Sequence, residues 1–132
     1  MVKVLPAKTP EAQAALCALH PVRPGFSCLY QATEDGQEKG WFAVRIDGEI
    51  LVITQMEVDG CRSEPETADE RYFAELMTRA AASYAINRML FTLRYEPTQY
   101  RGFLRRFGFT DDADGALRVE IARLTHRCGG AH

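Results

Sequence analysis

Apolar residues recur along the chain with two different periods, and these periods predict which segments are helices and which are strands. The clearest helical pattern runs from Ala68 to about Arg88, where apolar residues follow one another at spacings of three and four. Its apolar positions are Phe73, Leu76, Met77, Ala80 and Tyr84. Because this spacing gathers side chains on one side of an α-helix, we predict a long amphipathic helix packed against the rest of the domain.

Other apolar runs are short, alternating or continuous, and these predict strands. The predicted strands are Val2 to Pro6, Phe26 to Ala32, Trp41 to Ile46, Glu49 to Val58, Met89 to Tyr95 and Leu117 to Leu124. Asp47-Gly48 separates two of the runs and favours a type I′ hairpin turn, because both central residues of that turn need positive φ. The three strands between residues 26 and 58 therefore form an antiparallel meander.

Two further helices complete the predicted order. The first runs from Pro10 to about Leu19 with Thr9 as its N-cap, and the last starts at Pro97 or Thr98 and ends at Gly108. The resulting order is strand, helix, three strands, helix, strand, helix, two strands. It predicts one α/β domain of mixed α+β type over residues 1–132, with a mixed central sheet and helices on both faces. The long helix is a crossover, so the strands on either side of it should be parallel.

Composition and charge exclude several classes of partner. Eighteen acidic and sixteen basic residues give a net charge of −2 without a block of like charge, which favours neither nucleic acid nor an anionic membrane. The apolar stretches are far shorter than the ~20 residues of a membrane span, and the N-terminus lacks the apolar length of a signal peptide. The four cysteines form no metal or disulfide spacing, and His20, His126 and His132 lack a second ligand nearby. We expect a cytoplasmic protein without a metal site.

The end of the predicted last helix has a recognisable form. The segment Tyr100 to Phe109 reads Tyr-Arg-Gly-Phe-Leu-Arg-Arg-Phe-Gly-Phe and follows a predicted strand. It resembles the GNAT superfamily of acyl-CoA N-acyltransferases, in which a helix after the penultimate strand leads into Gly-Phe, here Gly108-Phe109. The resemblance covers most of Phe26 to Leu124. It implies the GNAT fold, acyl transfer from acetyl-CoA to an amine, and a small-molecule amine or acyl-CoA as partner.

Two family motifs are degenerate in this sequence. The position where the family often places its general-acid Tyr holds Leu104. The loop that cradles the pyrophosphate is rich in glycine in the family, but here it would fall on Thr67 to Tyr72, which contains no glycine. Arg71 is the candidate cofactor-binding residue of this segment. Asp69 and Glu70 suit the positive end of the helix dipole but would repel a pyrophosphate at the same position.

The resemblance also assigns candidate roles to residues near the end of the Glu49 to Val58 strand. Glu57 is the candidate general base, because some family members carry a catalytic Glu there, and the backbone of Met56 and Val58 would align the thioester. Tyr100 is a candidate general acid in place of Leu104. The alternative for Glu57 is an ordinary solvated carboxylate, and the alternative for Tyr100 is a packing residue.

Two functions stay open at this point. The first is an N-acetyltransferase with a degenerate cofactor loop, in which acetyl-CoA binding is weak or absent. The second is a non-catalytic GNAT-fold module that binds a small molecule or a protein partner, and the missing glycines favour it. A homodimer through the apolar edge of the sheet is compatible with either. We also predict that Phe103 and Leu104 are buried or line a cleft and that Phe107 and Phe109 lie in the core.

Overall fold

The structure is a computed structural model that describes residues 1–124. Its element order is the one predicted from the sequence: β1 (Val2–Pro6), α1 (Pro10–Leu19), β2 (Cys28–Glu34), β3 (Gln37–Asp47), β4 (Ile50–Val58), α2 (Ala68–Ile86), β5 (Thr92–Tyr95), α3 (Arg101–Phe107), β6 (Thr110–Asp111) and β7 (Leu117–Glu120). A helical turn follows at 121–124, where the sequence pattern predicts the end of a strand.

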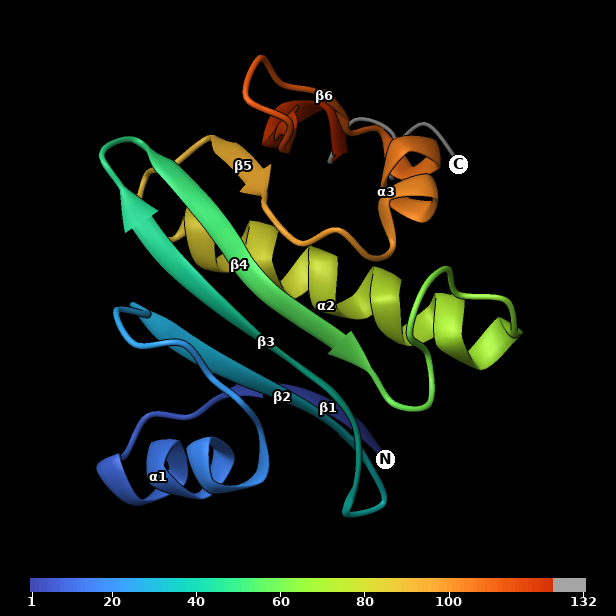
Figure 1. The fold of residues 1–132 in the computed structure, drawn as a ribbon. Helices are drawn as coiled ribbons and strands as arrows, with labels where there is room; N and C mark the ends of the chain where they lie inside the picture. Colours follow the sequence, from blue (N-terminus) through green and yellow to red (C-terminus); the bar gives the residue numbers. More distant parts are fainter. Residues whose placement is uncertain (125–132) are drawn as a thin grey trace.

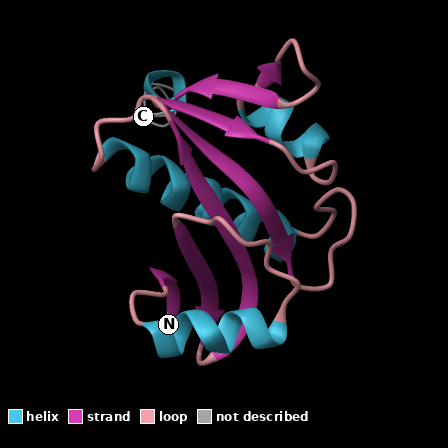
Figure 2. Cartoon of the chain, turned by 60° about the vertical axis from the view of Figure 1, so that its left-hand side comes forward, coloured by secondary structure: helices cyan, strands magenta, loops and turns pink. Residues whose placement is uncertain are grey.

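The strands form a single mixed sheet in the order β1-β2-β3-β4-β5-β7-β6. Strands β1 to β4 are antiparallel to one another, whereas β4 and β5 are parallel, as the crossover through α2 predicts. Helix α1 lies on one face of the sheet and α2 on the other (Figures 1 and 2). The fold is therefore an α/β domain with helices on both faces.

The main core lies between the sheet and α2. Phe73, Met77 and Tyr84 are buried there as predicted, although Leu76 and Ala80 are only partly buried. At Gly40 of β3, an added Cβ would lie 2.7 Å from the Glu57 carbonyl oxygen of β4 and 2.8 Å from the Met77 methyl carbon of α2. A side chain at this position would therefore clash with the backbone of the neighbouring strand. A smaller core under α1 contains Leu16, Leu29, Trp41 and Ala43.

The turns of the meander differ from the prediction in one respect. A turn with positive φ at both central residues, as type I′ requires, lies between β2 and β3, at Asp35 (52°) and Gly36 (83°). In the turn between β3 and β4, Asp47 still pairs with Ile50, so the central residues are Gly48 and Glu49, and only Gly48 has positive φ. The predicted type I′ turn at Asp47-Gly48 is therefore wrong, because β3 continues one residue further, to Asp47, and β4 begins one residue later, at Ile50.

Several predicted element starts are also wrong: β2 starts at Cys28 instead of Phe26 and β3 at Gln37 instead of Trp41. The errors at the starts of β5 and α3 have a common reason. Met89 (φ 61°) and Tyr100 (φ 65°) both adopt the left-handed conformation, which neither a strand nor an α-helix can include. Strand β5 consequently starts at Thr92 instead of Met89, and α3 starts at Arg101 instead of residue 97 or 98. Met89 is 74% exposed, and its N–H donates to the Ile86 carbonyl oxygen at the end of α2.

The aromatic residues of the last helix divide between core and surface. Leu104 and Phe109 are buried, as predicted, and Phe103 is partly buried. Phe107 is only half-buried, which corrects its predicted core position. Its ring stacks on Phe103 with 5.8 Å between centroids, and the Arg79 guanidinium lies over it at 5.6 Å. Phe107 therefore packs between Phe103 and Arg79 beside the core.

None of the helices within residues 1–124 combines the length and the apolar character that a membrane span needs. The cytoplasmic location stays a prediction. His126, Cys128 and His132 lie outside the described residues. Within the described ones, no group of three or more histidine, cysteine or acidic side chains is arranged to hold a metal ion.

Candidate functional site

Strand β4 continues beyond its last pairing with β5, and the predicted site residues Met56, Glu57 and Val58 lie on this extension. The parallel pairing covers Ile50 to Ile53 of β4 and Thr92 to Tyr95 of β5. After it β4 runs on along β3, while the chain after Tyr95 leaves the sheet and leads into α3, as Figure 1 shows. We call Thr54–Val58 the splayed edge of β4.

Backbone groups of the splayed edge bond to side chains of the segment before α3. The Gln99 Nε2 atom donates to the Met56 carbonyl oxygen at 2.7 Å. The Val58 N–H donates to the Tyr100 hydroxyl oxygen at 3.0 Å. The Val58 carbonyl oxygen accepts the Cys61 N–H at 2.9 Å. Three of the backbone groups of Met56 and Val58, the residues that the family resemblance assigns to the thioester, are therefore already engaged within the chain.

Tyr100 is held from several sides. Its side chain is fully buried, and its hydroxyl donates to the Cys61 carbonyl oxygen at 2.6 Å while accepting the Val58 N–H. Its own N–H donates to the Ser63 carbonyl oxygen at 2.8 Å. Burial raises the pKa of this hydroxyl, so it stays protonated at neutral pH. The hydroxyl hydrogen that a general acid would transfer is engaged in the hydrogen bond to the Cys61 carbonyl oxygen.

Backbone N–H groups at the start of α2 are hydrogen-bonded to a carboxylate of the helix itself. Thr67 caps the helix by accepting the Glu70 N–H at 3.0 Å. One oxygen of the Glu70 carboxylate accepts the N–H groups of Glu66 and Thr67, at 2.9 and 3.0 Å. The hydrogen bonds from Thr67 and Glu66 lower the pKa of Glu70 below its ordinary value. This reciprocal capping box puts a negative side chain on N–H groups at the helix start, where the family binds pyrophosphate.

Arg71 lies in the first turn of α2, and its side chain contacts the loop before the helix instead of the splayed edge. Its guanidinium donates to the Glu66 carbonyl oxygen, and the side chain is exposed. It therefore braces the loop before α2. Its predicted contact with a cofactor stays a prediction.

A second carboxylate ties the same loop to α3. Glu64 accepts the N–H groups of Gly102 and Phe103 at 3.0 and 2.7 Å, which caps the first turn of α3. The contact is tight enough that a Cβ on Gly102 would lie 2.8 Å from the carboxylate. Sequence reasoning missed Glu64, because it lies 38 residues before Gly102, whose N–H it accepts.

Glu57 faces a different space from its neighbours Met56 and Val58. It pairs with Trp41 across the sheet, and since paired residues project to the same face, its side chain lies on the α1 side. It lines a cavity of about 310 Å³, which we call the polar cavity. The lining residues are Pro21, Arg23, Trp41, Thr54, Gln55, Met56, Glu57, Glu96, Pro97, Thr98 and Gln99.

Charged side chains in the polar cavity differ in how they are paired. Glu96 forms an ion pair with Arg45 at 3.6 Å. Within residues 1–124, neither the Arg23 guanidinium nor the Glu57 carboxylate has a hydrogen bond or ion pair with another side chain. The cavity therefore holds one unpaired positive and one unpaired negative group.

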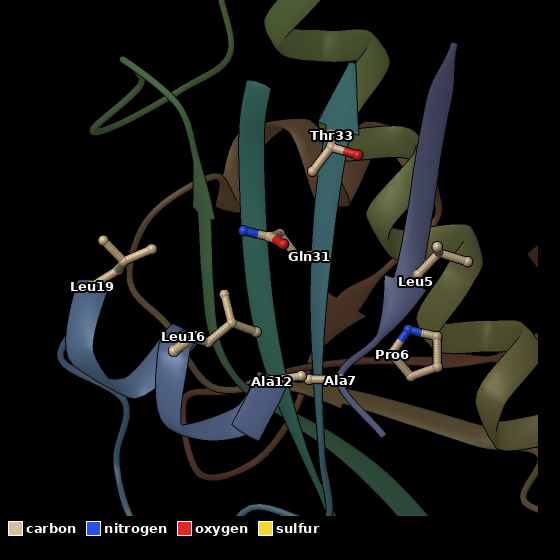
Figure 3. A pocket seen from close by; sticks show the side chains of 9 residues that line it. Leu5, Pro6, Ala7, Ala12, Leu16, Leu19, Gln31 and Thr33 are labelled. Atoms are coloured by element: carbon tan, nitrogen blue, oxygen red, sulfur yellow. The ribbon is translucent and has the colours of Figure 1, made fainter. Parts of the chain in front are cut away.

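Another cavity, of about 330 Å³, lies between α1 and strands β1 and β2 (Figure 3). Leu5, Leu16 and Leu19 contribute apolar side chains to it, and Gln31 and Thr33 of β2 supply its polar atoms. Among residues 1–124, no charged residue lines it, and it contains none of the predicted site residues. The polar cavity is the better candidate for ligand chemistry.

Comparison with known proteins gives a match in structure and none in sequence. The chain matches no protein-family model and no curated protein sequence. It superposes on an acetyltransferase assigned to the GNAT family from Desulfovibrio desulfuricans with a TM-score of 0.65 and 15% identity, over 92% of this chain and 99% of that one. The chain has the GNAT fold.

Two further GNAT-fold structures give the same picture. One is the ribosomal-protein-S18-alanine N-acetyltransferase of Escherichia coli, with a TM-score of 0.59 and 12% identity over 92% of this chain and 94% of that one. The other is YhhK of Escherichia coli, assigned as an N-acetyl transferase and bound to coenzyme A, with a TM-score of 0.59 and 12% identity over 91% and 98% of the two chains. Identities this low establish the fold and leave the activity of this chain open.

On this GNAT fold, the structure gathers most of the predicted site residues at the end of β4. Met56, Val58 and Tyr100 meet at the splayed edge, and Glu57 lies on the opposite side of the same strand end. Sequence reasoning missed Gln99, whose side-chain amide donates to the Met56 carbonyl oxygen at the splayed edge. A glutamine before a helix carries no local signal for this contact, which depends on β4 and the 96–100 segment lying side by side.

Proposed function

We propose that this chain is a GNAT-fold module that binds a small molecule and does not catalyse acetyl transfer, because its own side chains bond to the backbone groups that the GNAT resemblance assigns to acyl-CoA. One observation carries this proposal. The buried Tyr100 hydroxyl bridges the Val58 N–H and the Cys61 carbonyl oxygen. A thioester aligned along β4 would have to displace this bridge.

Displacement would be costly. The Tyr100 ring is fully buried, and moving it would leave two backbone groups to find other partners. A buried polar group without a partner costs ~1–3 kcal/mol. Cofactor binding would have to supply this free energy before any net affinity appeared.

The start of α2 adds a second obstacle. A pyrophosphate there would compete with the Glu70 carboxylate for the N–H groups of Glu66 and Thr67. Each charge-assisted hydrogen bond that a phosphate oxygen fails to make forfeits ~1.5–3 kcal/mol. Since a factor of ten in affinity corresponds to ~1.4 kcal/mol, the loss of about 3 kcal/mol would weaken a micromolar site to roughly 0.1 mM.

Calorimetric titration with acetyl-CoA tests the proposal. We expect a Kd of roughly 0.1 mM or weaker for the unmodified protein. Glu70→Ala should improve the affinity more than Asp69→Ala does. The two variants remove the same charge from the same helix turn, but only Glu70 bonds to the loop N–H groups. Low-micromolar or tighter binding to the unmodified protein would refute the closed-site proposal.

Acetyl transfer to an amine is the second candidate function. The observation that favours it is the unpaired Glu57 carboxylate, which faces a cavity bounded by the same strand end that holds Met56. Glu57 would then accept a proton from the amine. In that case tight acetyl-CoA binding should be accompanied by acetylation of an amine, and Glu57→Gln should lower the rate of acetylation without weakening acetyl-CoA binding.

A further inference from the structure

We infer that the polar cavity binds a small zwitterion, a ligand with one carboxylate and one ammonium group such as a free α-amino acid. The inference deepens the proposed function, since it names the class of small molecule for the same module and rests on that proposal. It comes from the charges, the walls and the size of the cavity.

The charges of the cavity are matched by a ligand that carries both signs. Arg23 and Glu57 line the same cavity, yet they form no ion pair with each other or with other side chains of residues 1–124. Glu96 is already paired with Arg45. The available charges are therefore one guanidinium and one carboxylate. A ligand bearing only one charge would satisfy one of them and meet the other as a like charge.

Trp41 supplies an independent observation. Its side chain is only 3% exposed, and its indole nitrogen is the buried side-chain nitrogen or oxygen atom that lacks a hydrogen-bond partner among the described residues. Indole N–H can only donate, and buried donors are normally paired. Trp41 lines the cavity, so the carboxylate of a bound zwitterion becomes an acceptor for this N–H when a small shift of the neighbouring side chains exposes the indole nitrogen.

Both walls of the cavity are fixed before any ligand arrives. On one side, the Gln55 amide accepts the Arg23 N–H at 2.8 Å and donates to the Pro21 carbonyl oxygen at 2.9 Å. On the other side, Gln99 donates to the Met56 carbonyl oxygen, and the Gln99 carbonyl oxygen accepts the Tyr95 hydroxyl at 2.9 Å. A site that is ordered in advance loses less free energy on binding.

The size of the cavity limits the ligand. Pockets for drug-sized molecules measure about 300–1,000 Å³, and the polar cavity, at about 310 Å³, stands at the bottom of that range. A free amino acid fits such a volume, whereas a coenzyme does not.

Tryptophan fluorescence can test the inference directly, because Trp41 is the only tryptophan in the chain. The unmodified protein is titrated with L-alanine and L-glutamine as zwitterions, and with propionate and ethylamine as single-charge analogues. We expect a saturable fluorescence change with at least one amino acid. Both single-charge analogues should bind at least roughly tenfold more weakly than that amino acid. No saturable change with either amino acid overturns the inference, as does ethylamine or propionate binding as tightly as the amino acid.

Matched variants locate the binding. Arg23→Gln and Glu57→Gln should each weaken amino-acid binding roughly tenfold, because each removes one charge-assisted contact. Arg106→Gln and Glu49→Gln remove exposed charges outside the cavity and should leave the affinity unchanged. Equal affinities for all four variants contradict the assignment. Thermal unfolding by circular dichroism verifies that each variant is folded.

The two proposals fail in different ways. Low-micromolar acetyl-CoA binding refutes the proposed function, whatever the fluorescence titration gives. Weak acetyl-CoA binding together with no amino-acid binding leaves the closed splayed edge in place and refutes only the zwitterion.

Discussion

The splayed edge of β4 and the polar cavity share the same strand end, but they differ in whether their polar groups have partners within the chain. At the splayed edge, the Met56 carbonyl and the Val58 N–H are bonded to Gln99 and Tyr100. In the cavity, Glu57 between them carries a carboxylate that forms no hydrogen bond or ion pair with another side chain of residues 1–124. Hydrogen bonds made within the chain contribute to folding stability, whereas an unpaired charge near the surface contributes little to it. The comparison separates residues that hold the domain together from residues available to a ligand.

The strongest test of this contrast is Tyr100. Tyr100→Ala should lower the free energy of unfolding by ~3–5 kcal/mol, the usual cost of truncating a fully buried aromatic side chain. Tyr100→Phe keeps the ring and removes only the hydroxyl bridge, so we expect ~1–3 kcal/mol from the two backbone groups left without it. Urea unfolding measures both. A Tyr100→Phe variant as stable as the unmodified protein would show that the bridge is dispensable and that the splayed edge opens easily.

Glu64 should have the next largest effect. Its carboxylate accepts two N–H groups of α3, and hydrogen bonds to charged groups contribute ~1.5–3 kcal/mol. We expect Glu64→Ala to cost about that much in urea unfolding. Glu66→Ala, two residues away in the same loop, removes an exposed carboxylate and should change stability by less than about 0.5 kcal/mol. Equal losses in the two variants would contradict the capping role of Glu64.

The capping box of α2 predicts a smaller, pH-dependent effect. The folded-state pKa of Glu70 lies below its ordinary value of 4.5, so its contribution to stability is present above pH 4.5 and is lost as the pH falls through the folded-state pKa. Glu70→Gln cannot titrate at this position. The melting temperature of the unmodified protein should therefore fall more steeply below pH 4.5 than that of Glu70→Gln. Parallel melting curves over this range would show that the box contributes nothing.

Arg23 and Glu57 should have the smallest effect on stability. Both side chains are exposed and unpaired within residues 1–124, so Arg23→Gln and Glu57→Gln should change the free energy of unfolding by less than about 0.5 kcal/mol each. The same variants are expected to weaken ligand binding. A loss above about 1 kcal/mol in urea unfolding would place these residues in the same class as Tyr100.

Much of the fold could be predicted from the sequence, because its signals are local. Thr9 and Thr67 both begin helices as N-caps, and the periodic segment after Thr67 identifies α2 as the crossover that makes β4 and β5 parallel. The start of α3 could not be predicted in the same way. It depends on the left-handed Tyr100, which is held by Cys61 and Ser63 from almost 40 residues away.

The candidate site was predicted only in part, for the same reason. Met56, Glu57 and Val58 follow from the resemblance and lie together because they are consecutive. Which of them faces a ligand depends on partners from other segments. Trp41 comes from β3 and Arg23 from the break after α1, and nothing in either segment by itself indicates a shared cavity.

The hydrogen bond from Val58 to Tyr100 has a consequence for the dynamics of the domain. The Val58 amide is protected by one side chain instead of a neighbouring strand, so its exchange with deuterium requires that side chain to move away. The exchange rate at this single amide therefore measures how often the Val58 N–H is released from the Tyr100 hydroxyl. Any ligand that needs the same N–H binds only to that open fraction, and its apparent affinity is reduced in proportion. One backbone amide thus reports the free energy that separates the closed domain from a form able to receive a cofactor.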